Sequence, residues 1–165
     1  MLKDEEVYKR LEKHEGFRSK KYKCSANRWT IGIGHNLEAR EFTPEEKKAL
    51  GDWENGITRN GALMLLRNDI TLCLNDLKKL GFWHYLDDER QYALLDMAFQ
   101  MGYDGLCKFK KMLEAIRVKD YPEAARQCFD SAYGQQTPVR AKRIAVLLKS
   151  AKWVEDRDTL KGIKL

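Results

Sequence analysis

The spacing of apolar and polar residues changes its period within the first forty residues. Val7, Leu11 and Glu15 recur at i, i+4 and i+8, which predicts an amphipathic helix over residues 3–15 that ends at Gly16. From residue 17 to 37 the period becomes two, with a polar turn over residues 25–28. This pattern predicts a β-hairpin whose apolar face carries three residues: Trp29, Ile31 and Ile33.

The rest of the chain has the signals of helices. Thr43-Pro44-Glu45-Glu46 reads as a capping box with proline at the first helical position, and residues 51–56 read as a loop. Thr58 begins a long helix over residues 59–80, about 30 Å at 1.5 Å per residue. Four further helices are predicted, over residues 88–101, 103–118, 120–132 and 138–148. The tail around Trp153 is left unassigned.

These elements predict an α+β fold that is mainly helical, with a small antiparallel sheet in the N-terminal third. We expect one domain over residues 1–165. Within it, residues 15–58 would form a small α+β lobe, and residues 1–14 and 59–165 a helical lobe. The long helix has the length to connect the two lobes.

Composition and charge exclude several classes of protein. The chain is 43% hydrophobic and 34% charged, which indicates a folded core and excludes disorder. No apolar run reaches the roughly 18 residues that a membrane span needs, and the acidic N-terminus does not resemble a secretion signal. A net charge of +6 favours polyanionic partners without choosing among them.

The four cysteines lack the spacing of a metal site, so we expect no metal and mostly buried, free thiols. Cys73, Cys107 and Cys128 fall inside predicted helices. Cys24 instead falls at the hairpin turn, where a purely structural role is less expected.

Glu15 is the anomaly in this pattern. It completes an apolar stripe, where burial would raise the pKa of its carboxyl group and suit it to act as a general acid. The ordinary alternative is a glutamate at a helix end that faces solvent or pairs with an arginine. If the hairpin folds back over the helix end, Glu15, Cys24 and Thr30 would converge.

Four blocks of sequence support this convergence of Glu15, Cys24 and Thr30. Glu15-x8-Cys24-x5-Thr30 is followed by Ile31-Gly32-Ile33-Gly34-His35, and further on by residues 99–102 (FQMG) and 136–143 (QTPVRAKR). In this order the blocks resemble the phage-type lysozymes of glycoside hydrolase family 24. The resemblance covers nearly the whole chain and implies a two-lobed lysozyme fold.

The resemblance also implies roles for individual residues. Glu15 would be the general acid, Thr30 would position the attacking water, His35 would be structural, and Arg140 would hold the acid through a charge-assisted contact. Five positions match substrate contacts: Asn36, Phe99, Gln100, Met112 and Gln127.

Cys24 departs from the T-even type of this family, which has aspartate at the matching position. As a neutral thiol it would stabilise an oxocarbenium-like transition state less than a carboxylate does. As a thiolate it would act as base or nucleophile, given a nearby cation such as Lys21, Lys23 or Arg28. The sequence leaves open whether Cys24 is nucleophile, base or spacer.

The resemblance implies a muramidase that hydrolyses the β-1,4 bond between N-acetylmuramic acid and N-acetylglucosamine in bacterial peptidoglycan. We expect a monomeric phage endolysin that accumulates in the host cytoplasm and needs a holin to reach the wall. No cofactor, nucleic-acid partner or stable membrane insertion is expected. Two alternatives are a wall-binding relative that has lost catalysis and, on charge alone, a nucleic-acid-binding helical protein.

Overall fold

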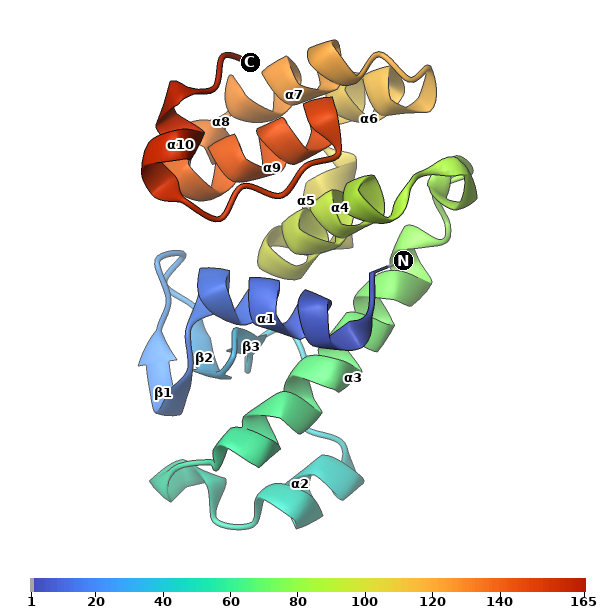
Figure 1. Ribbon diagram of the computed structural model, residues 1–165. Coiled ribbons are helices and arrows are strands. Elements are labelled where there is room, and N and C mark those ends of the chain that lie inside the picture. Colours follow the sequence, from blue (N-terminus) through green and yellow to red (C-terminus); the bar gives the residue numbers. More distant parts are fainter. Residues whose placement is uncertain (1) are drawn as a thin grey trace. The chain divides into compact units, whose positions relative to one another are not determined.

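A computed structural model describes residues 2–165, in which 63% of the chain is helical and the strands form a small antiparallel sheet (Figure 1). The described residues divide into two compact units: residues 3–72, and residues 73–165 together with Leu2. The α+β class expected from the sequence is therefore confirmed.

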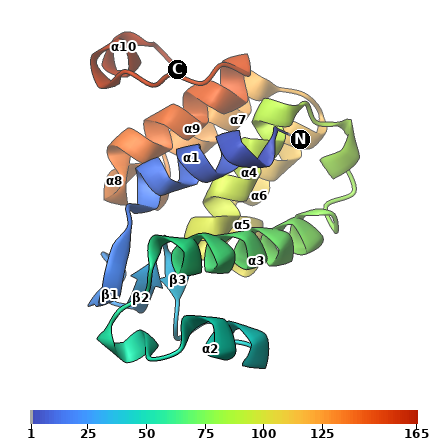
Figure 2. The same ribbon diagram turned by 60° about the horizontal axis from the view of Figure 1, so that its bottom comes forward.

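The first unit begins with helix α1 (Asp4–Glu15) and the strands β1 (Arg18–Lys23), β2 (Trp29–Gly32) and β3 (His35–Asn36). Helix α2 (Pro44–Leu50), a 3-10 turn η1 (Trp53–Asn55) and most of helix α3 (Arg59–Leu77) complete it. The three strands are antiparallel in the order β1-β2-β3 (Figure 2). The predicted hairpin thus continues into a third, short strand.

Gly32 lets the sheet approach α3 closely. Its φ of +66° lies in the left-handed region, and a Cβ at this position would stand 3.1 Å from both the Ala62 Cβ and the Ile57 Cδ1. A side chain here would require both the backbone and the helix to move. The glycine therefore fixes the distance between β2 and the start of α3.

The second unit is helical. It contains a 3-10 turn η2 (Trp83–Tyr85) and seven α-helices within the described residues. The helices are α4 (Asp88–Met101), α5 (Tyr103–Cys107), α6 (Lys110–Arg117), α7 (Tyr121–Phe129), α8 (Ala132–Gln136), α9 (Pro138–Ser150) and α10 (Arg157–Gly162). Helix α7 packs against both α6 and α9, and the middle parts of α4 and α9 are buried.

Two helices expected from the sequence have other bounds in the structure. The stretch 103–118 divides into α5 and α6 around Lys108 and Phe109. The helix expected over 120–132 is α7, which ends at Phe129, before α8 begins at Ala132. The Ser131 hydroxyl donates to the Cys128 carbonyl at 2.6 Å, so the side chain satisfies a group at the end of α7. The tail left unassigned contains α10, whose Asp156 side chain accepts from the Thr159 N–H.

The expected apolar face of the hairpin is wrong at one position. Ile31 and Ile33 are buried, but Trp29 is 41% exposed. The Nζ atoms of Lys21 and Lys23 lie 5.6 and 4.5 Å from the centre of its ring. Cation–π attraction therefore holds an indole that the alternation alone assigned to the core.

The cysteines are free, as expected, but less buried than expected. Only Cys128 is buried, while Cys24, Cys73 and Cys107 are partly exposed.

Candidate active site

Glu15 is the last residue of α1, in the first unit. Val7 and Leu11 of the same stripe are fully buried, whereas Glu15 is half-buried. The helix stops here because Gly16 takes a φ of +71° while its N–H still donates to the Glu12 carbonyl. Glu15 therefore lies where the helix ends and the chain turns into β1.

Cys24 begins the turn between β1 and β2. Its N–H donates to the Arg28 carbonyl at 3.0 Å, and its carbonyl accepts from the Asn27 N–H at 2.8 Å. Asn27 has a φ of +57°, which asparagine tolerates better than most residues. Thr30 follows in β2, is 4% exposed, and donates its hydroxyl to the Arg28 carbonyl at 3.1 Å.

The pKa of the Cys24 thiol lies below its ordinary value. Burial acts to raise this pKa, but hydrogen bonds to the sulfur outweigh burial; they come from the Arg28 backbone, the Thr30 side chain and the Ala26 backbone. The turn thus favours the thiolate, as donors around a sulfur anion do. Hydrogen bonds provide this effect, not the neighbouring cations that the sequence suggested.

Two of those cations, Lys23 and Arg28, are paired with the carboxylate of Glu38. The Glu38 carboxylate accepts from Lys23 Nζ at 3.3 Å, from Arg28 Nη1 at 3.1 Å and from the Trp29 N–H at 2.9 Å. These contacts lower the pKa of Glu38 to about 2, the Trp29 N–H having the largest effect. Glu38 therefore closes the turn that carries Cys24, a role the sequence did not suggest.

The pKa of Tyr22 responds to the charges of both Glu15 and Cys24. Burial raises the pKa of its phenol, and the negative charges of Glu15 and Cys24 raise it further, while Arg18 opposes them. The Arg18 guanidinium lies 4.6 Å from the centre of the Tyr22 ring. Both acidic groups are thus near one phenol, and the sequence offered no signal for Tyr22 beyond its place two residues before Cys24.

His35 is buried beside Asp69 and Phe42. Its side chain is 1% exposed, its Nδ1 lies 2.7 Å from an Asp69 carboxylate oxygen, and its ring stacks on Phe42 with centroids 5.1 Å apart. The Nε2 atom is buried without a hydrogen-bond partner.

Arg40 extends this contact into a network that sequence analysis missed. Its guanidinium donates to Asp69 at 2.6 and 3.0 Å and to Glu46 at 2.7 and 3.0 Å. Asn68 also donates to Glu46, at 2.7 Å. Burial acts to raise the pKa of Glu46, but these donors lower it to about 2. Because Asp69 and Asn68 lie on α3 and Glu46 on α2, the network ties both helices to the end of the sheet.

Asn36, expected to contact substrate, uses its side-chain oxygen in a turn, and its substrate role stays a prediction. The Oδ1 atom accepts from the N–H groups of Glu38 and Ala39 at 2.9 and 3.1 Å. This geometry is an Asx turn, which fixes the chain after β3.

The other expected substrate contacts lie in the second unit. Phe99 and Gln100 are half-buried at the end of α4, and Gln100 Oε1 is buried without a partner. Met112 is 1% exposed, so its side chain belongs to the core of the unit. Gln127 on α7 is half-buried, and its Nε2 donates to Glu123 at 2.7 Å.

Arg140, at the start of α9, is paired with a buried carboxylate. Its Nε donates to Asp96 Oδ1 at 2.8 Å, and Asp96, on α4, is completely buried and also accepts from the Tyr92 hydroxyl at 3.0 Å. The contact between Arg140 and Glu15 that the sequence suggested would join the two units and stays a prediction.

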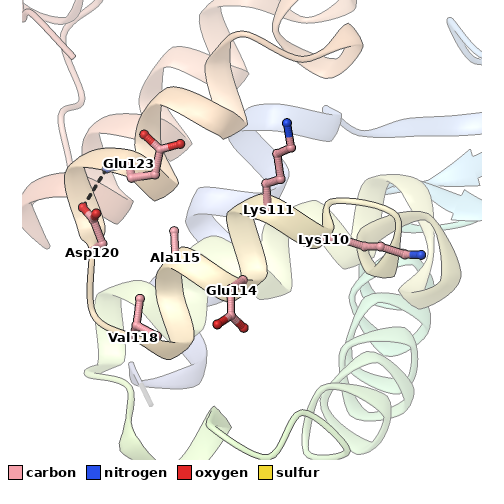
Figure 3. A pocket seen from close by; sticks show the side chains of 7 residues that line it. All are labelled: Lys110, Lys111, Glu114, Ala115, Val118, Asp120 and Glu123. Carbon is pink, nitrogen blue, oxygen red and sulfur yellow. Dashed lines mark hydrogen bonds between the residues drawn. The ribbon is translucent and has the colours of Figure 1, made fainter.

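A pocket of about 400 Å³ opens between α6 and the start of α7 (Figure 3). Figure 3 shows lysine and carboxylate side chains around it, and the Glu123 N–H donating to Asp120 at 3.2 Å. Its lining residues are Lys110, Lys111, Glu114, Ala115, Val118, Asp120 and Glu123. Through the hydrogen bond to Glu123, Gln127 is connected to this pocket.

Two kinds of feature are absent from residues 2–165. No cluster of three or more His, Cys, Asp and Glu side chains has the arrangement of a metal site. None of the helices described has the length and apolar character that crossing a membrane requires.

Comparison with known proteins decides the family, because the phage lysozyme family model matches residues 12–145. The chain belongs to the phage lysozyme family. Lysozymes are glycoside hydrolases, so the chain is assigned to that class of enzyme.

Three relatives illustrate the range of the family. The chain is 35% identical over 152 residues to the pre-baseplate central spike protein Gp5 of Enterobacteria phage T4. The matched region covers 84% of this chain and 26% of Gp5. The chain therefore spans about a quarter of that relative. It is 30% identical over 149 residues to the probable T4-type lysozyme 2 of Dictyostelium discoideum, covering 81% of this chain and 88% of the relative. An endolysin of Acyrthosiphon pisum secondary endosymbiont phage 1 is 28% identical over 137 residues, covering 78% and 82%.

Proposed function

We propose that this phage-type lysozyme hydrolyses the β-1,4 bond between N-acetylmuramic acid and N-acetylglucosamine in bacterial peptidoglycan. The observation that carries the proposal is the grouping of Glu15, Cys24 and Thr30 in one unit. Glu15 and Cys24 both raise the pKa of Tyr22, and the Thr30 side chain lowers the pKa of Cys24. The family match includes all three residues.

In the proposed mechanism, Glu15 gives its proton to the glycosidic oxygen as the bond from this oxygen to the anomeric carbon breaks. The leaving sugar departs as an alcohol, and positive charge develops on the other sugar. Thr30 orients the water that adds to the anomeric carbon.

Cys24 acts as a thiolate in this scheme. Its negative charge stabilises the oxocarbenium-like transition state, and it accepts the proton that the water loses. The lowered pKa of Cys24 supports this role. The Thr30 hydroxyl can donate one hydrogen bond. In this scheme it donates to the Arg28 carbonyl when Cys24 is a neutral thiol, and to the sulfur when Cys24 is a thiolate.

The substrate roles of Asn36, Phe99, Gln100, Met112 and Gln127 are proposed from the resemblance. Gln127 has the most support, since it is hydrogen-bonded to a residue that lines a pocket. Asn36 and Met112 have the least, because the Asn36 oxygen is used in a turn and Met112 is buried.

The test is the release of reducing ends from purified peptidoglycan, together with loss of turbidity in outer-membrane-permeabilised Gram-negative cells. Glu15→Gln should abolish both, whereas Glu5→Gln, on the exposed face of the same helix, should leave both unchanged. Cys24→Ala should lower the rate and Cys24→Asp should restore it. Full activity of Glu15→Gln would overturn the assignment of the acid, and wall binding by the parent without any release of reducing ends would indicate a non-catalytic binder.

We also propose a role in host lysis, in which the monomeric enzyme accumulates in the host cytoplasm and reaches the wall through a holin. The name of one relative, endolysin, supports this role. Expression in bacterial cytoplasm should cause lysis only when a holin is co-expressed. The name of another relative, a spike protein, suggests action from the phage particle instead; finding this chain in purified particles by mass spectrometry would overturn the proposal of lysis from within.

A further inference from the structure

A second pocket, of about 250 Å³, lies in the helical unit where α10 meets the start of α9. Its seven lining residues come from the end of α7, the first half of α9, and α10, which can be followed in Figure 1. They are Phe129, Pro138, Val139, Lys142, Arg157, Leu160 and Lys161. None of its lining residues is assigned to the proposed hydrolysis.

The lining has two chemical parts. Phe129, Pro138, Val139 and Leu160 are apolar, and the remaining three residues are cations. None of the seven is acidic, in contrast to the pocket between α6 and α7, where three of the seven are carboxylates. An apolar floor with cations around it is complementary to an anionic head attached to an apolar tail.

The cations are not neutralised by strong ion pairs. Arg157 has no ion-pair partner among residues 2–165, and Lys161 pairs only with Asp158 at 3.3 Å, where both side chains are largely exposed and the pair is weak. Lys142 Nζ lies over the Phe129 ring, 5.4 Å from its centre, so its charge faces the aromatic part of the apolar floor and not a carboxylate. The nearby Asp156 side chain is used to cap α10.

The pocket depends on a segment outside the family match. That match ends at residue 145, whereas Arg157, Leu160 and Lys161 belong to α10. Leu160 is 2% exposed, so it anchors α10 while contributing to the floor. The segment after residue 145 thus adds a cationic, apolar-lined hollow to the lysozyme unit.

We propose that this pocket binds a small anionic amphiphile, with the apolar tail against Phe129, Val139 and Leu160 and the anionic head between Lys142, Arg157 and Lys161. The ligand chemistry is that of a carboxylate or phosphate on an acyl chain, which a free fatty acid or a membrane lipid would supply. Its lining includes none of the proposed catalytic residues.

The test uses sodium octanoate as the probe and follows backbone amide resonances by NMR. Octanoate should shift Phe129, Val139 and Leu160 in a saturable way. Acetate has the head without the tail, and octylammonium has the tail with the opposite charge; neither should saturate these shifts over the same concentrations. Equal binding of octylammonium, or saturable shifts confined to other residues, would overturn the proposal.

Variants provide the second arm. Arg157→Glu combined with Lys161→Glu should weaken octanoate binding about tenfold or more, because both charges at the head are reversed. Lys110→Glu combined with Lys111→Glu makes the same change of charge at the other pocket and should leave the affinity unchanged. Similar affinities for both pairs, at unchanged melting temperatures, would refute the site.

Vesicles distinguish the two sources of the ligand. Binding to phosphatidylglycerol vesicles but not to phosphatidylcholine vesicles, lost in the Arg157→Glu and Lys161→Glu protein, would identify membrane lipid as a source. Binding to monomeric octanoate alone would identify a free amphiphile.

Discussion

The His35 Nδ1 atom lies 2.7 Å from the Asp69 carboxylate, which joins the last strand of the sheet to α3. Asp69 also accepts two hydrogen bonds from Arg40, so one carboxylate serves both a buried imidazole and a largely buried guanidinium. The pair is separated by 34 residues in sequence, and no local pattern connects its members.

Replacing Asp69 by asparagine should therefore lower the stability of the fold. The variant Asp69→Asn leaves Arg40 and His35 without their shared anion in a poorly solvated place, and we expect a loss of about 3 kcal/mol in the free energy of unfolding. Urea denaturation measures this loss. Asp76→Asn is the control, because Asp76 pairs with the exposed Lys79 and should change stability by less than about 0.5 kcal/mol. Equal effects of the two substitutions would contradict the importance of the network.

Glu46 predicts how stability responds to acid. Its pKa is lowered from an ordinary value of 4.5 to about 2 in the folded chain. Since the folded pKa lies below the unfolded one, the stabilisation is fully present above about pH 4.5 and is lost as the pH falls towards 2. Thermal melts over this range should show a steep loss of stability that Glu46→Gln reduces. Glu45→Gln, at the exposed neighbouring position, should keep the parent's slope, and an unchanged slope in Glu46→Gln would refute the prediction.

The four thiols should differ in reactivity. The lowered pKa of Cys24 predicts that iodoacetamide modifies it at pH 7 to 8, while burial raises the pKa of Cys128 to about 12 and keeps it unmodified in the folded protein. Thr30→Val removes one hydrogen bond to the sulfur and should slow the modification of Cys24 about twofold to fivefold. Peptide mass spectrometry measures the rates. Thr30→Ser keeps the hydroxyl and should react like the parent; a Thr30→Val protein that reacts equally fast would exclude a role of Thr30 in setting the pKa.

Gly134 should not tolerate any side chain. A Cβ there would stand 1.7 Å from the Phe129 carbonyl oxygen, in the tight passage from α7 to α8. Gly134→Ala should lower the melting temperature sharply and reduce the free energy of unfolding by about 3 kcal/mol or more. The loss is large because a backbone atom cannot move aside as a side chain does. Gly81→Ala, where nothing lies within 4 Å, is the matched control and should be neutral. A stable Gly134→Ala protein would mean that α7 and α8 are separated more widely.

The sequence predicted those parts of the fold and site that depend on local patterns. The capping box at Thr43 and Glu46, the end of α1 at Gly16 and the turn containing Cys24 follow from residue types a few positions apart, and the structure has all three. Glu15, Cys24 and Thr30 were found because their spacing matches a family motif, and their catalytic roles stay predictions.

The missed features depend on contacts between distant residues. Arg40, Asp69 and Glu46 meet only after α2 and α3 pack, and Glu38 closes a turn from nine residues beyond Trp29. The alternation of apolar and polar residues assigns Trp29 to the core, because that pattern does not include the two lysines whose ammonium groups lie over its ring. The helix over 103–118 is predicted as continuous, and the helix over 120–132 is predicted to end three residues too late, because Lys108, Phe109 and Asp130 are neither glycine nor proline.

Trp29 also gives the chain an optical reporter. The indole is 41% exposed beside the turn of Cys24 and one residue before Thr30, whereas Trp83 is 4% exposed. Its fluorescence is accessible to dissolved quenchers, and the attraction of two ammonium groups makes an anion such as iodide an efficient one. Because Trp53, Trp83 and Trp153 also emit, the difference between the parent and a Trp29→Phe variant reports on the surroundings of the thiol, and a glycan strand bound there would shield Trp29.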